Sequence, residues 1–206
     1  MKNTIIKEVL HYAIPLSITN LLGVLAGIIS TIFIAQTGDN SLAAFAIANT
    51  TLMTISAFCS ACLYGISILA SRARASKDVT KVANYSINGV YFALMMSVPA
   101  MFILMSGTYI LKLLNQDLSL IAISTKFFWY SALSMPIIML NSALGQIFIA
   151  VGKPKITTII TAIRLPIIIG LNYYFIFIAN NRRIDGIAKA QLNSELLCLV
   201  LVVTYI

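Results

Sequence analysis

The chain has 206 residues, of which 60% are hydrophobic and only 10% are charged, with a net charge of +8. A soluble domain usually carries about a quarter charged residues, so this composition excludes a soluble fold and indicates an integral membrane protein in a lipid bilayer. The basic residues lie in short clusters between apolar runs, which reflects membrane topology and predicts no nucleic-acid partner.

Six apolar stretches follow one another along the chain, each long enough for a helix that crosses a bilayer core of ~30 Å. The first, Ile14 to Ala35, contains no charged residue. No long polar segment separates the stretches, so we predict an all-α polytopic membrane bundle in which residues 1–206 form a single six-helix lobe. The predicted spans are residues 12–35, 42–70, 84–106, 127–150, 156–179 and 186–206.

Four of the predicted helices contain a proline in their interior, namely Pro15, Pro99, Pro136 and Pro166. Proline removes a backbone hydrogen bond and bends a helix, which membrane spans tolerate when neighbours satisfy the freed carbonyl. Four bent helices indicate a bundle shaped around a cavity. Between the third and fourth spans, Asn115 to Lys126 is expected at the surface, and Phe127 to Tyr130 are expected to form an aromatic belt at the membrane interface.

The distribution of lysine and arginine predicts the orientation of the spans. One side carries eight of them, Lys2, Lys7, Arg72, Arg74, Lys77, Lys81, Lys153 and Lys155, and the other carries four, Lys112, Lys126, Arg182 and Arg183. Because basic residues concentrate on the cytoplasmic side, the N-terminus is expected in the cytoplasm. The expected location is the inner membrane of a bacterium.

Two charged residues fall inside the apolar runs, where a charge costs at least ~2.5–3.5 kcal/mol and usually pairs or faces water. Arg164 lies eight residues into the fifth span, about 12 Å deep, and Glu195 lies nine residues into the sixth from the opposite side, about 14 Å deep. These depths match, so we predict that the two side chains face the bundle interior as an ion pair. The pair is either a static structural contact or part of substrate or proton handling.

The sixth span is polar around this point, and Asn193 and Ser194 are expected to line a polar interior beside Glu195. Alternatively, this segment enters the membrane only at Leu196. Asn172 in the fifth span and Ser30 in the first are neutral polar residues that cost less to bury.

Enzymatic signatures do not stand out. The sequence shows no HExxH motif, no nucleophile–base pair and no clustered His, Asp and Glu set, so we expect no enzyme, no metal site and no cofactor. Cys59-x-x-Cys62 has no basic neighbour to lower a thiol pKa and no further ligands, which predicts ordinary buried cysteines.

Several stretches resemble the multidrug and toxic compound extrusion (MATE) family of cation-coupled efflux transporters. They are IPLSITNLL at Ile14–Leu22, STIFIAQTGDNSLAAFAIAN at Ser30–Asn49, SALGQIFIAVGKPK at Ser142–Lys155, NYYFIF at Asn172–Phe177 and GIAKA at Gly186–Ala190. The resemblance implies a twelve-helix transporter of two six-helix lobes around a central cavity, of which this chain corresponds to the N-terminal lobe. A second six-helix lobe is then an expected partner.

The chain departs from this family at the positions that bind the coupling ion. An aspartate common in the first span is Ser30 here, and an asparagine and aspartate of the fifth span are Ile168 and Asn172. The family threonine of the sixth span maps to Ser194. Glu195, tuned by Arg164, is then the remaining candidate for a buried coupling carboxylate.

The function implied by the resemblance is secondary active transport, in which amphipathic or cationic drug-like compounds are exported in exchange for H+ or Na+. One alternative is a truncated or degenerate membrane module that does not transport. Another is a related flippase of polysaccharides or lipid precursors from the same superfamily.

Overall fold

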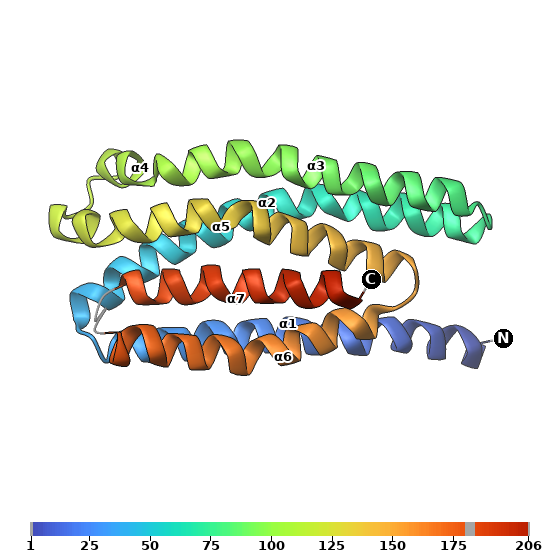
Figure 1. The fold of residues 1–206 in the computed structure, drawn as a ribbon, viewed down its shortest axis with the longest axis horizontal. Coiled ribbons are helices and arrows are strands. Elements are labelled where there is room, and N and C mark those ends of the chain that lie inside the picture. The colour runs from blue at the N-terminus through green and yellow to red at the C-terminus, as the bar shows by residue number, and fades with distance from the viewer. Residues whose placement is uncertain (1, 180–183, 206) are drawn as a thin grey trace.

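The computed structural model describes residues 2–179 and 184–205, and this part of the chain is almost entirely helical (Figure 1). Arg182, Arg183 and Ile206 lie outside the described residues. The elements are α1 (Lys2–Ala35), α2 (Asp39–Ala75), α3 (Val79–Met105), α4 (Gly107–Leu113), α5 (Leu118–Ala150), α6 (Pro154–Tyr173), a π-helix η1 (Tyr174–Ile178) and α7 (Ile184–Tyr205).

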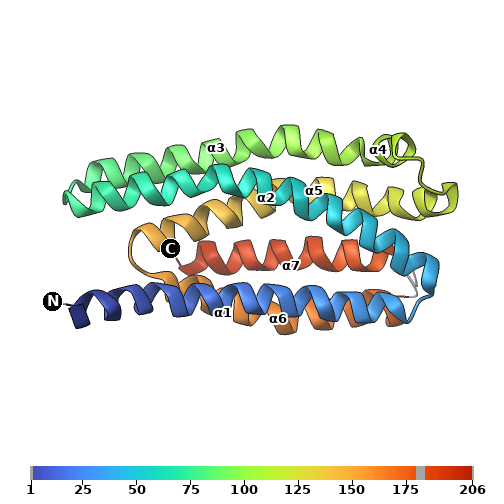
Figure 2. The ribbon, with the colours of Figure 1, turned by 180° about the vertical axis from the view of Figure 1, so that it is seen from behind.

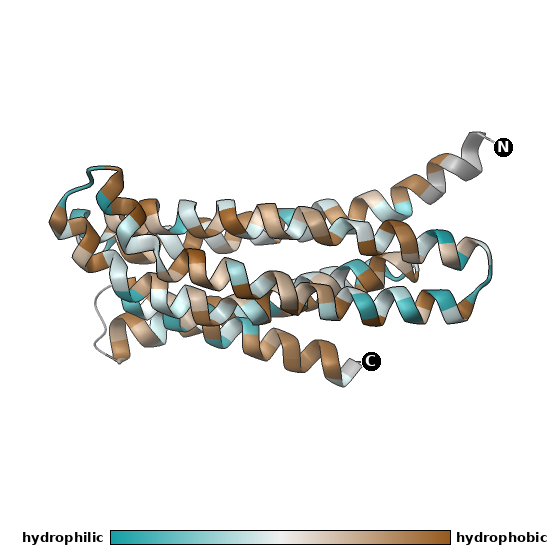
Figure 3. Cartoon of the chain, turned by 90° about the horizontal axis from the view of Figure 1, so that it is seen from above, coloured by the Kyte–Doolittle hydropathy of each residue, from teal (hydrophilic) through white to brown (hydrophobic). Residues whose placement is uncertain are grey.

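Within the described part of the chain, six helical segments are long and apolar enough to cross a membrane, which confirms the predicted six-span bundle. The segments are Val9–Ala35, Asp39–Ala75, Val79–Met105, Leu118–Ala150, Pro154–Ile178 and Ile184–Thr204. Figure 3 shows apolar residues along the length of the helices and polar residues gathered at the turns. Both chain ends lie toward the end of the bundle that holds the α2–α3 and α5–α6 turns, as an even number of spans requires (Figure 1).

The segment after the third span differs from the prediction. Residues 115–126 were expected at the surface, and all but Ile121 and Ser124 are at least partly exposed, but α5 already begins at Leu118 and not at the predicted residue 127. The polar residues of this first part of α5 satisfy their hydroxyls on its own backbone, as Ser124 Oγ does by donating to the Leu120 carbonyl at 2.8 Å. The predicted aromatic belt is also wrong for Phe127 and Phe128, whose side chains are fully buried in the core.

Helix α5 is the centre of the bundle. It packs against α2 and α3 on one side and against α7 on the other, and its buried residues form much of the hydrophobic core. Helix α7 lies between α5 and α6, so it joins the α2–α3–α5 group to the α1–α6 pair (Figures 1 and 2). The core needs close approaches of these helices: a Cβ at Gly89 would lie 2.7 Å from Ile66, and one at Gly107 would lie 2.6 Å from the Phe128 ring.

The prolines predicted inside helices are all found there, in α1, α3, α5 and α6. The carbonyl of Pro15 is also a point of contact between α1 and α6. The Pro15 carbonyl accepts from Thr158 Oγ1 of α6 at 2.8 Å and is also within 2.9 Å of Thr19 Oγ1. These hydroxyls fasten α1 to α6 along their shared face.

Candidate functional site

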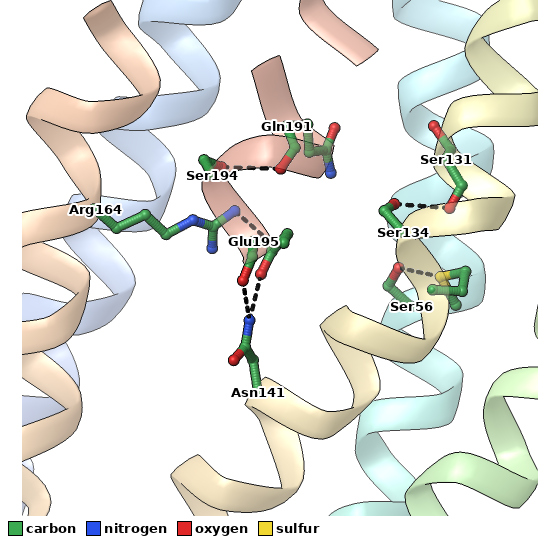
Figure 4. A network of polar contacts seen from close by, with 9 residues as sticks. Ser56, Ser131, Ser134, Asn141, Arg164, Gln191, Ser194 and Glu195 are labelled. Atoms are coloured by element: carbon green, nitrogen blue, oxygen red, sulfur yellow. Dashed lines mark hydrogen bonds and ion pairs between the residues drawn. The ribbon is translucent and has the colours of Figure 1, made fainter. Parts of the chain in front are cut away.

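The predicted ion pair between α6 and α7 is present. An Arg164 guanidinium nitrogen donates to Glu195 Oε1, and the two side chains meet inside the bundle (Figure 4). The Glu195 side chain is only 6% exposed, whereas the Arg164 side chain is 30% exposed. The depth argument from the sequence therefore identified the correct partner for each charge.

A third residue, Asn141 of α5, completes this cluster and was not predicted. Asn141 Nδ2 donates to Glu195 Oε2 at 2.8 Å and to the Glu195 backbone carbonyl at 3.1 Å (Figure 4). Each carboxylate oxygen thus accepts one hydrogen bond, the first of them charge-assisted. We call Asn141, Arg164 and Glu195 the central cluster, and it links the three consecutive spanning helices α5, α6 and α7.

The signal for Asn141 was present in the sequence but weak. A neutral amide in an apolar run costs less than a charge and draws less attention. Its own Oδ1 is buried and has no partner among the described residues.

Asn172 and Ser30 form a second, neutral contact between α6 and α1. Asn172 Nδ2 donates to Ser30 Oγ at 2.9 Å, and Ser30 Oγ lies 2.9 Å from the Ala26 carbonyl to which it donates. Asn172 is completely buried, and its Oδ1 has no partner within the described residues. The π-helix η1 begins two residues later, at Tyr174, and such wide turns are frequent at functional sites.

Ser194 and Asn193 do not join the central cluster. Ser194 is buried, and its Oγ donates to the Gln191 carbonyl at 3.0 Å. Asn193 Nδ2 donates to the Lys189 carbonyl at 2.8 Å. Both side chains therefore bond to the backbone of their own helix. The amide of α7 that does line the interior is Gln191, which contributes to the wall of the first of the two cavities described next.

Two cavities meet at the central cluster. The first, of about 590 Å³, extends from Arg164 and Glu195 toward Phe45 at the start of α2 and Ile187 at the start of α7. The second, of about 580 Å³, extends in the opposite direction toward Gln146 at the end of α5. Six residues line both cavities: Thr19, Asn20, Ile138, Thr161, Arg164 and Glu195. The ion pair thus lies where the two halves of the interior join.

A second ion pair lies near the first turn of α7. Lys126 Nζ of α5 is 3.3 Å from Asp185 Oδ2, and Asp185 is largely buried. Lys189 lies over the Tyr130 ring at 5.5 Å from its centroid and adds a cation–π contact between the same helices. These contacts fix the start of α7 against α5.

The cysteines divide differently from the prediction. Cys59 and Cys198 are buried as expected, but Cys62 is exposed on the surface of α2. All three are free thiols.

Comparison with known proteins identifies a transporter family and two bacterial relatives of this chain. The chain matches the MatE family over residues 15–174. It is 26% identical over 172 residues to a probable multidrug resistance protein NorM of Acinetobacter baylyi, and 25% identical over 173 residues to one of Bacillus subtilis. Each match covers 84% of this chain and 38% of the relative, so the chain spans less than half the length of these proteins.

Solved structures with the same fold include a MOP superfamily transporter from Pyrococcus furiosus, with a TM-score of 0.88 at 18% identity. An outward-facing multidrug resistance MATE family transporter gives the same TM-score and identity. The chain is covered to 95% in both, and it corresponds to 43% and 44% of the two neighbours. The six-helix bundle is therefore the fold of one part of these longer transporters.

Proposed function

Since this chain belongs to the MatE family, we propose that it forms one lobe of a secondary active transporter for amphipathic compounds, coupled to H+ or Na+ through Glu195. The observation that carries the proposal is the central cluster: a buried carboxylate held between a guanidinium and an amide where two cavities join. Ionisable groups inside a membrane protein commonly mark ion or substrate pathways. The family resemblance gives export in exchange for the ion as the expected direction.

Glu195 supports coupling because of its position and its surroundings. Among the residues that line the two cavities it is the one carboxylate. Arg164 stabilises the charged form and is itself in contact with both cavities, so a change of charge on Glu195 alters the contacts of a neighbouring helix. An ion pair with a purely structural role would not need to line two cavities that extend in opposite directions.

The contact between Ser30 and Asn172 supports the same assignment. Neither side chain carries a charge, and the two are hydrogen-bonded to each other at 2.9 Å. A hydroxyl and an amide do not titrate in the physiological range, so these positions are unsuited to hold a coupling proton. We therefore place proton coupling in this lobe on Glu195.

A second lobe belongs to the proposal, because the chain spans only 38% of the length of the transporters it matches. We propose that a second six-helix unit completes the pathway, with the N-terminus of this chain in the cytoplasm of a bacterial cell. The alternative is a lobe that folds in the membrane and does not transport.

Vesicles separate these alternatives. The chain is reconstituted into liposomes at a high protein-to-lipid ratio, so that a second copy can supply the other six-helix unit, and movement of an amphipathic dye is recorded after a pH or sodium gradient is imposed. We expect gradient-driven movement that is lost in Glu195→Gln and retained in Asp117→Asn, which neutralises an exposed carboxylate at the start of α5. Unchanged coupling in Glu195→Gln contradicts the assignment of Glu195, and no movement with the natural sequence shows that this chain alone does not transport.

A further inference from the structure

The guanidinium of Arg164 has more hydrogen-bond donors than partners. Its planar group carries five N–H donors, and it makes one hydrogen bond to a described residue, the bond to Glu195 Oε1. Its side chain is 30% exposed and contributes to the walls of both cavities. Several N–H groups of a permanent cation are therefore available to a ligand in the interior.

The carboxylate of Glu195 is in the opposite situation. Arg164 occupies Oε1 and Asn141 occupies Oε2, and the side chain is only 6% exposed. A cationic ligand would have to approach a carboxylate that is almost fully buried and already neutralised by Arg164. An anionic ligand needs no displacement, because the free edge of the Arg164 guanidinium can receive it directly.

The cavity of about 590 Å³ provides the remaining contacts. Its volume lies in the range that holds a drug-sized ligand, and most of its lining is apolar, with Leu52, Met53 and Ile138 among the wall residues. Asn20, Asn49 and Gln191 add neutral amides that can orient a polar group. The site thus combines one accessible cation with an apolar chamber.

We propose that this cavity binds an amphipathic anion, with the anionic head on the free N–H groups of Arg164 and the apolar body against α1 and α2. The inference rests on the proposed function and names the substrate class of its site. Carboxylate, sulfonate and phosphate heads share the required chemistry, because each presents oxygens in the geometry that guanidinium donors match.

The arrangement also sets the sign of coupling. A proton on Glu195 removes the negative charge that competes for Arg164, so proton and anion favour one another at this site, and by linkage each raises the affinity for the other. The other ionisable side chains that line either cavity are Tyr64 of α2 and Cys198 of α7. For an anionic ligand the site therefore favours movement together with the proton, in place of the exchange that the family resemblance implies for cationic compounds.

Binding of two matched probes tests the inference without any gradient. The chain is placed in phosphatidylcholine nanodiscs and equilibrated with 1-naphthalenesulfonate or with N,N,N-trimethyl-1-naphthylammonium, which have the same aromatic body and opposite charges. Empty nanodiscs give the background. We expect saturable binding of the sulfonate and weaker binding of the ammonium probe. Preferred, saturable binding of the ammonium probe would overturn the proposal.

Three variants locate the binding. Arg164→Gln should weaken sulfonate binding roughly 10- to 100-fold, the effect of losing hydrogen bonds to a charged group. Glu195→Gln should strengthen sulfonate binding, because it removes the negative charge that competes for Arg164. Lys155→Gln, which replaces an exposed lysine on the helix of Arg164, should have no effect. Sulfonate affinity that is unchanged by Arg164→Gln, or lost in Glu195→Gln, would refute the assignment.

Arg164→Gln alone leaves an unpaired buried charge and could misfold, so a double variant provides a second test. Arg164→Gln with Glu195→Gln leaves no unpaired charge, and it should bind the sulfonate as weakly as Arg164→Gln alone. Binding as strong as in the natural sequence overturns the proposal. If lysophosphatidylglycerol displaces the sulfonate and decanoate does not, the natural anion is a lipid headgroup, and the reverse result identifies a small organic acid.

The two proposals can fail separately. If the sulfonate binds at Arg164 but the chain moves no dye across vesicles, the anion-binding proposal is supported and the transport proposal is refuted. Gradient-driven transport with no selectivity for the anionic probe would remove only the substrate class.

Discussion

The central cluster predicts a large non-additivity between substitutions of Arg164 and Glu195. Arg164→Met leaves the Glu195 carboxylate, 6% exposed, with Asn141 as its one described partner. Removal of one member of a buried pair costs about 3–5 kcal/mol, and the two cavities beside this pair place it near the lower value, about 3 kcal/mol. Glu195→Leu should cost less, about 2 kcal/mol, because the Arg164 side chain is already 30% exposed and can turn into a cavity.

The double variant, Arg164→Met with Glu195→Leu, buries no charge and fills a similar volume with apolar atoms. Such replacements are often neutral or stabilising, so we expect a net loss within about 1 kcal/mol, well below the sum of the single effects. The assay is reversible unfolding in mixed detergent micelles, supported by melting temperatures. For a chain of this size about 3 kcal/mol lowers Tm by roughly 6–12 °C. If the losses in unfolding free energy of the two single variants simply add in the double variant, the two charges do not stabilise each other. Lys155→Met, which replaces an exposed lysine, serves as the control.

Two further predictions concern the packing around Gly107 and the ion pair between Lys126 and Asp185. Gly107→Ala should lower stability by about 1–3 kcal/mol, because the added Cβ would lie 2.6 Å from the Phe128 ring in a filled core, and a melting curve measures this loss. Lys126→Gln should cost no more than about 1 kcal/mol, since the lysine is 68% exposed and its contact with Asp185 is partly screened by water. A Tm fall of more than 10 °C in Lys126→Gln would contradict this assignment.

The charged part of the site could be predicted from sequence because charges inside apolar runs are rare and costly. Two such residues at matching depth in consecutive spans leave few other arrangements. The neutral part could not be predicted in the same way. Asn141 lies on α5, which is apolar around its whole circumference because it is surrounded by other helices, so no periodic pattern indicates which face Asn141 occupies.

The interface prediction failed for a related reason. An aromatic run next to a lysine is typical of a membrane boundary, and this interpretation holds for Trp129, which is exposed. It does not hold for Phe127 and Phe128, which point into the core beside α2 and α4. Composition places a segment at a depth in the membrane, but the direction of each side chain depends on which helices surround it.

The position of the central cluster gives its charges an influence on the whole bundle. Hydroxyl contacts around Pro15 and the Ser30–Asn172 hydrogen bond hold α1 and α6 together as one pair. The core holds α2, α3 and α5 together as a second group. The bond from Arg164 to Glu195 and the bonds from Asn141 to Glu195 are polar ties across α7 between these two groups. A ligand that draws Arg164 away from Glu195 would therefore remove one of the polar contacts between these two helix groups.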